Sequence, residues 1–124
     1  LTVINIPDSV ESIGDYIFKN CTNLKEVTLS NNITSIPDGA FYMCSSLTKL
    51  TIPNGVQSIG WNAFGSCEEL KEVYIPASVT SIKSAFYGCN NVHITVAAGS
   101  SLNENSFRDS GLSDSQIAEI TFEN

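Results

Sequence analysis

Hydrophobic positions recur along this chain at a constant interval of 23 residues. The leucine series marks the interval at Leu1, Leu24, Leu47 and Leu70. Isoleucine, phenylalanine and cysteine series share it, and the last two arrive one residue early in the fourth copy, which places a deletion between Ile82 and Ala85. Self-similarity at such a period predicts a repeat protein whose units stack into a solenoid.

Each unit combines two patterns. In segments such as LKEVTL and LTKLTI, apolar residues alternate with polar ones, which predicts a strand, and Pro7, Pro53 and Pro76 follow where that strand ends. Segments such as DGAFYMC have apolar residues at i, i+1 and i+4, which favours a helical turn or a short 3₁₀ segment. Between the two patterns we expect a second short extended piece, as at 35–36 or 58–59.

A single unit cannot fold alone, because burying its apolar side chains does not offset the entropy of ordering 23 residues. Stacked units bury both of their sides and pair their strands with both neighbours. We therefore treat residues 1–124 as one domain. Its predicted repeats are about 1–23, 24–46, 47–69 and 70–91, followed by a degenerate copy at 92–116 and a final strand at 117–124.

The C-terminal tail contains a helix-start motif and a strand pattern. A short helical turn followed by a strand accounts for both. Ser113 and Gln116 fit the capping box that opens a helix, S-x-x-Q. IAEITF then matches LKEVTL position by position, which predicts a strand at about 119–122. The residues expected to point inward are Ile117, Ile120 and Phe122.

The units LTVINIPDSVESIGDYIFKNC, LTKLTIPNGVQSIGWNAFGSC and LKEVYIPASVTSIKSAFYGC resemble BspA-like leucine-rich repeats. The resemblance is strong over residues 1 to about 96. Where the commoner leucine-rich repeats stack asparagines, this chain has Ser9, Asn32, Gly55 and Ser78. The resemblance implies an α/β right-handed superhelix with a parallel β-sheet on its concave face. It also implies a location at the cell surface or outside the cell, attachment to host, matrix or other cell-surface proteins, and no active site.

If the apolar strand residues point inward, the residues between them line the concave sheet in two columns. The first column runs from Val3 to Glu119 and the second from Asn5 to Thr121. The candidate partner-binding residues in these columns are Glu26, Thr28, Lys49, Thr51, Glu72, Tyr74, His93 and Thr95. Tyr74 is the best candidate for a binding anchor, although a solvated strand tyrosine is the simpler interpretation.

The charge balance argues against nucleic acid as a partner, and the short apolar runs argue against direct membrane insertion. Thirteen acidic residues against six basic ones give a net charge of -7, which would repel nucleic acid. No apolar run approaches the ~20 residues of a membrane span.

The cysteines and the single histidine do not indicate a cofactor, metal or catalytic site. The four cysteines lack C-x-x-C spacing and sit in an apolar slot, which favours free, buried thiols over disulfide bridges. His93 has Glu72 and Glu119 as predicted neighbours. A titrating surface histidine is the favoured interpretation, and a weak metal or pH-sensitive spot is the alternative.

We therefore interpret the chain as a protein–protein recognition module that uses the concave sheet and adjoining loops, with a rigid spacer as the alternative. Trp61, in the turn IGWNAF, is expected to project outward as a further contact residue. Both ends look open, because strands begin and end the chain. That pattern favours a segment of a longer solenoid, or end-to-end association through the exposed edge strands.

Overall fold

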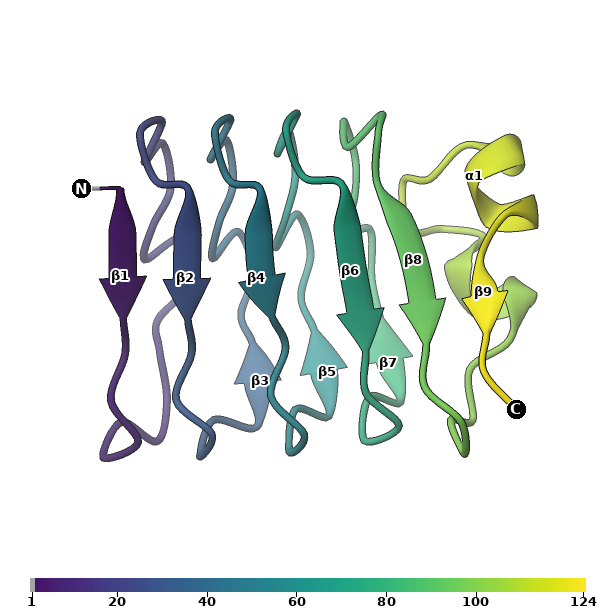
Figure 1. Cartoon of the computed structure of the whole chain (residues 1–124), viewed down its shortest axis with the longest axis horizontal. Coiled ribbons are helices and arrows are strands. Elements are labelled where there is room, and N and C mark those ends of the chain that lie inside the picture. The colour runs from purple at the N-terminus through teal and green to yellow at the C-terminus, as the bar shows by residue number, and fades with distance from the viewer. Residues whose placement is uncertain (1) are drawn as a thin grey trace.

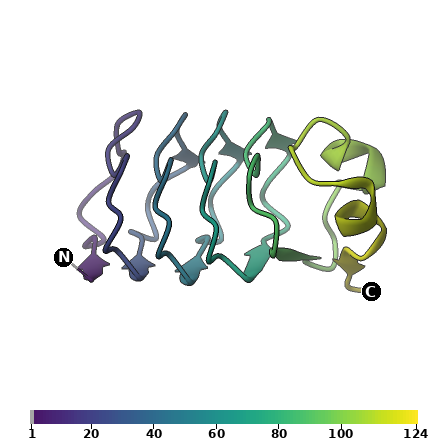
Figure 2. The same ribbon diagram turned by 90° about the horizontal axis from the view of Figure 1, so that it is seen from above.

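Successive coils of the chain lie side by side in the computed structural model, which describes residues 2–124 (Figure 1). The predicted inward position of Leu1 lies outside the described residues. Every coil places one strand in a front row, and the second, third and fourth coils add a short strand in a row behind it (Figure 2). The fold is the predicted parallel-strand solenoid. Its strands are β1 (Val3–Asn5), β2 (Glu26–Thr28), β3 (Ser35–Ile36), β4 (Lys49–Thr51), β5 (Ser58–Ile59), β6 (Glu72–Ile75), β7 (Ser81–Ile82), β8 (His93–Val96) and β9 (Thr121–Phe122).

All strand pairs are parallel and follow the repeat register. In the front row, β1, β2 and β4 form one ladder and β6, β8 and β9 form another, whereas β3, β5 and β7 form the back ladder. β4 and β6 are neighbours in Figure 1, but no ladder pairing joins them in the part of the chain that the structure describes. The front row runs nearly straight in Figure 2, so the surface expected to be concave is close to flat over these coils. We call this surface, formed by the outward residues of β1, β2, β4, β6, β8 and β9, the strand face.

The repeated apolar positions form one continuous core. Leu24, Leu47 and Leu70 are fully buried, and their strands run parallel, as the repeat requires. The phenylalanines stack along the solenoid axis with ring centroids 5.4, 5.7 and 5.6 Å apart, which gives each ring aromatic neighbours from the adjacent coils. The stacked rings are Phe18, Phe41, Phe64 and Phe86.

In each of the first four coils, the segment that contains the repeated phenylalanine is a series of hydrogen-bonded turns. The expected helical or 3₁₀ turn does not form there. Their backbone N–H groups alternate between two kinds of acceptor. In the second coil, Gly39, Phe41 and Met43 donate to carbonyls of the next coil at 2.8 Å, whereas the residues between them bond three positions back in their own coil. Gly39 and Met43 adopt positive φ to permit this alternation. Bonding to the next coil therefore takes the place of the helical bond pattern.

Helical segments occur only at the C-terminal end of the described residues, where η1 (Glu104–Phe107) and α1 (Asp114–Ala118) cover the stack (Figures 1 and 2). The capping box predicted from Ser113 and Gln116 is present in α1. Because α1 and its cap extend to Glu119, the strand that follows is shorter than predicted and begins at Thr121. Among the described residues β9 pairs only with β8, and both of its residues are exposed, so the expectation of an open edge at this end stays a prediction.

One inward prediction in the tail is also wrong. Ile117 and Ile120 are buried, but Phe122 remains 36% exposed. Its ring packs edge-on against Phe107 at a centroid distance of 6.5 Å, and this contact covers only part of the side chain. At the opposite end, the apolar residues of the first coil are partly buried, and Val3 and Ile17 are exposed. No helix among the described residues is long and apolar enough to cross a membrane.

Candidate functional site

The strand face carries the eight candidate residues in the predicted columns. Glu26 pairs with Lys49 and Thr28 with Thr51 across β2 and β4. Across β6 and β8, Glu72 pairs with His93 and Tyr74 with Thr95. The side chains on β2, β4 and β6 are exposed, and the two on β8 are partly buried. Since the ladder stops between β4 and β6, the candidate residues fall into two groups of four.

The first group surrounds a shallow hollow over β1, β2 and β4. Its volume is about 210 Å³, and its rim includes all four candidates of this group together with Val3 and Asn5. Lys49 Nζ lies 4.0 Å from Glu26 Oε1, and both side chains are largely exposed. An ion pair of this kind is screened by water and contributes little to stability, so both charges remain available to a partner.

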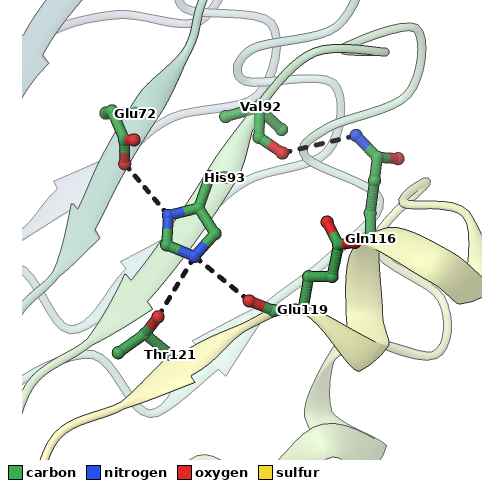
Figure 3. A network of polar contacts seen from close by, with 6 residues as sticks. All are labelled: Glu72, Val92, His93, Gln116, Glu119 and Thr121. Atoms are coloured by element: carbon green, nitrogen blue, oxygen red, sulfur yellow. Dashed lines mark hydrogen bonds and ion pairs between the residues drawn. The ribbon is translucent and has the colours of Figure 1, made fainter.

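The second group centres on His93, which links three strands (Figure 3). Its Nδ1 lies 3.1 Å from Glu72 Oε2, and its Nε2 lies 3.1 Å from both the Glu119 carbonyl oxygen and Thr121 Oγ1. The ring therefore bridges β6 to the C-terminal segment through β8. This arrangement differs from the prediction, because Glu119 contributes its backbone carbonyl, not its carboxylate.

The contacts of His93 suit a proton donor at each ring nitrogen. A carboxylate and a carbonyl oxygen can only accept hydrogen bonds, so the doubly protonated ring satisfies both of them at once. In the neutral ring, Nε2 can instead accept from the hydroxyl of Thr121. The histidine thus has a structural role that attaches β9 and the end of α1 to the solenoid. No group of three or more potential metal ligands occurs within residues 2–124.

The Tyr74 side chain is restrained by a hydrogen bond, unlike the solvated strand tyrosine of the simpler interpretation. Its hydroxyl donates to Glu123 Oε1 at 2.9 Å, which joins β6 to the residue after β9. This hydrogen bond raises the pKa of the Tyr74 phenol, because it favours the protonated form. The ring nevertheless remains 45% exposed, so it presents an aromatic surface whose position is fixed at its polar end.

The four cysteines are free thiols in a buried column, as the sequence analysis favoured. Cys44, Cys67 and Cys89 are buried, and Cys21 in the first coil is partly buried. Each buried thiol donates to the carbonyl of the preceding coil's phenylalanine, at 3.1, 3.2 and 2.8 Å respectively. Burial raises the pKa of Cys44 to about 11. The neighbouring Cys89 thiol, together with burial, raises the pKa of Cys67. Protonated, enclosed thiols of this kind are poor nucleophiles and poor metal ligands.

A second surface feature lies in the turns behind the strand face, and the sequence analysis found only part of it. Trp61 projects outward as expected and is 55% exposed. It shares a cleft of about 450 Å³ with two tyrosines that were not singled out, Tyr42 and Tyr87. Both follow the phenylalanine in an AFY triplet of their repeats, with Gly65 at the same position in the repeat between them. That alignment was the signal that could have revealed the cluster.

The comparisons with known proteins agree with this architecture. Residues 1–113 match the family model described as BspA type leucine rich repeat region, in six copies. No curated protein sequence matches the chain.

Three solved bacterial structures share the fold. The leucine-rich repeat protein of T. pallidum is 31% identical over 79% of this chain and 46% of its own, with a TM-score of 0.69. A leucine rich cell surface protein from Faecalibacterium prausnitzii is 34% identical over 100% of this chain and 30% of its own, with a TM-score of 0.75. A leucine-rich repeat protein from Bacteroides ovatus is 25% identical over 100% of this chain and 37% of its own, with a TM-score of 0.73.

The chain spans less than half the length of each of these three proteins. The family model nevertheless covers most of this chain. The chain therefore belongs to the BspA-type leucine-rich repeat family.

Proposed function

We propose that this chain is a non-enzymatic recognition module that binds another protein through the strand face and its adjoining loops. The observation that carries the proposal is the combination of exposed charges and an anchored, exposed aromatic ring on one nearly flat surface. Glu26 and Lys49 supply charges of both signs, and Tyr74 supplies the aromatic ring. Tyrosine is among the residues that most often dominate binding energy at protein interfaces.

The proposed location is the cell surface or the space outside the cell, and the proposed partner is a host, matrix or other cell-surface protein. One structural relative is named as a cell surface protein, which supports this location. The front row by itself is too narrow for an average interface of ~800 Å² per partner. Loops beside the strands, or further coils, would complete the contact area.

The test is a binding measurement with the paired substitution of Tyr74→Ala and Lys49→Ala. Wild-type protein should bind saturably to at least one member of a panel of immobilised host and matrix proteins. The paired variant should remain folded and lose affinity by about tenfold or more. Tyr16→Ala is the matched control, because this tyrosine is exposed but lies outside the strand face. Equal affinity of the paired variant and wild type would contradict the proposal.

A rigid spacer remains the second candidate, and one observation favours it. The phenylalanine stack and the inter-coil hydrogen bonds run through consecutive coils, so each coil is held on both sides. A spacer needs this stiffness and no partner. It would show no saturable binding to any member of the same panel.

A further inference from the structure

The cleft behind the strand face has walls of aromatic rings and a rim of neutral polar groups. Trp61, Tyr42 and Tyr87 supply the rings, and Tyr87 is 68% exposed. The polar residues lining the cleft are Asn62, Ser66 and Ser84. The cleft lies in the turns that follow β3, β5 and β7, which belong to the back row in Figure 1. It is therefore separate from the strand face.

The repeat itself builds the cleft. Tyr42, Gly65 and Tyr87 occupy the same position in three successive coils, so the two tyrosines stand on either side of a residue that has no side chain. A methyl group built on Gly65 would come within 2.8 Å of the Tyr42 ring, which leans over this glycine. Strands of adjacent coils are about 4.8 Å apart, so rings two coils apart leave room between them.

The polar groups of the cleft are free to bind a ligand. Within the described part of the chain, only the Ser84 hydroxyl has a partner, donating to the Asp109 carbonyl at 2.6 Å. The Asn62 amide, the Ser66 hydroxyl and the Trp61 indole N–H make no hydrogen bond to residues 2–124. Together they offer donors and acceptors around an aromatic surface.

We infer that this cleft binds a neutral pyranose sugar, as a monosaccharide or as one residue of a longer glycan. A pyranose has a face of C–H groups, which stacks on aromatic rings, and an edge of hydroxyl groups, which bond to amides and hydroxyls. The volume of about 450 Å³ lies within the range of small-molecule sites and accommodates such a ring.

The lining distinguishes this ligand from charged ones. No Lys or Arg lines the cleft, so a phosphate or carboxylate ligand would lack a counter-charge. No Asp or Glu lines it either, although the chain carries thirteen acidic residues. A quaternary ammonium group would fit the rings alone, and would leave the amide and hydroxyl groups of the rim without partners.

The experiment uses the intrinsic fluorescence of Trp61, which is the single tryptophan of the chain. The probes are the methyl pyranosides of glucose, galactose, mannose and N-acetylglucosamine, with choline chloride as a cationic probe. At least one pyranoside should change the emission saturably, with a Kd in the millimolar range expected for a small ligand at an open site. Saturation-transfer NMR should show contact at the sugar ring protons for the same probe.

Two variants and a control locate the binding. Tyr87→Ala removes one exposed wall and should weaken binding by about tenfold. Gly65→Ala displaces the Tyr42 ring and should weaken it as well, since Gly65 has no positive φ that alanine would strain. Tyr16→Ala, which removes an exposed tyrosine from the first coil and outside the cleft, should bind as wild type does.

Three results would overturn the inference. The first is the absence of a saturable response to every pyranoside. The second is saturable binding of choline when the pyranosides do not bind. The third is pyranoside binding that Tyr87→Ala leaves unchanged.

Discussion

Among single residues, the repeated cysteine position shows how one side chain stabilises the contact between successive coils. Each buried thiol donates to a phenylalanine carbonyl of the preceding coil, so the cysteine is both a small hydrophobic residue and an inter-coil hydrogen-bond donor. In the fifth coil the slot holds Ser110, whose hydroxyl donates to Phe107 of its own coil. The serine side chain therefore fills the slot without linking two coils, and only the backbone carbonyl of Ser110 accepts from the preceding coil, from the Phe86 N–H at 2.8 Å.

The first prediction concerns thiol reactivity in the native protein. At pH 8, a thiol reagent such as dithionitrobenzoate should react quickly only with Cys21, because the other three cysteines are buried. The remaining thiols should react once the protein is unfolded in denaturant. Detection of fewer than four thiols after unfolding would show that disulfides had formed.

The second prediction follows from the raised pKa of Cys44. The pKa of about 11 in the folded state lies above the ordinary thiol value of 9.0, so between these two pH values the folded protein keeps this proton while the unfolded chain loses it. The thiol's contribution to stability is therefore complete below pH 9 and falls as the pH rises from 9 to about 11. Thermal unfolding of wild type and Cys44→Ala should show a smaller loss of stability in the variant over this interval. Parallel curves would contradict the burial of the thiol.

At the scale of elements, the C-terminal helix and last strand are held by side chains that reach across coils. Gln116 completes the capping box of α1, and its Nε2 also donates to the Cys89 carbonyl at 2.8 Å. His93 and Tyr74 bind residues in or beside β9. The capping residues were recognisable from their spacing. The repeat register also predicted Glu72 beside His93. The bonds from His93 to the Glu119 carbonyl and from Tyr74 to Glu123 were not predicted, because they depend on the path of the chain around α1.

The third prediction concerns this attachment. His93→Ala removes contacts to Glu72, Glu119 and Thr121, and should lower the free energy of unfolding by about 1 kcal/mol. Amide hydrogen exchange should become faster in β9 and in the residue after it, Glu123, whose N–H donates to the Val96 carbonyl. The matched control is Lys49→Ala on the same face, which loses only an exposed ion pair. Unchanged exchange in β9 would mean that His93 does not hold the strand.

At the scale of the whole molecule, the coils form one cooperative stack because their largest side chains touch from coil to coil. Phe64 lies between Phe41 and Phe86, and all three are fully buried. Loss of a ring in the middle of the stack removes contacts on both sides and leaves a cavity. A ring at the edge, such as that of Phe122, has fewer contacts to lose.

The fourth prediction tests this difference. Phe64→Ala should lower the free energy of unfolding by roughly 3–5 kcal/mol, and Phe122→Ala by much less. Urea unfolding followed by Trp61 fluorescence measures both changes. Comparable losses in the two variants would show that the central stack is not the main source of stability.

The sequence by itself determined the solenoid, the parallel register of its strands and the two outward columns of the strand face. It could do so because the same apolar pattern is repeated, and only stacking buries that pattern in every copy. Contacts that the repeat register does not set are visible only in three dimensions. The interruption between β4 and β6, the bonds of His93 and the aromatic cleft around Gly65 depend on how separate coils align. Those alignments come from backbone bonding between coils and from side-chain packing, which a pattern of apolar and polar positions does not describe.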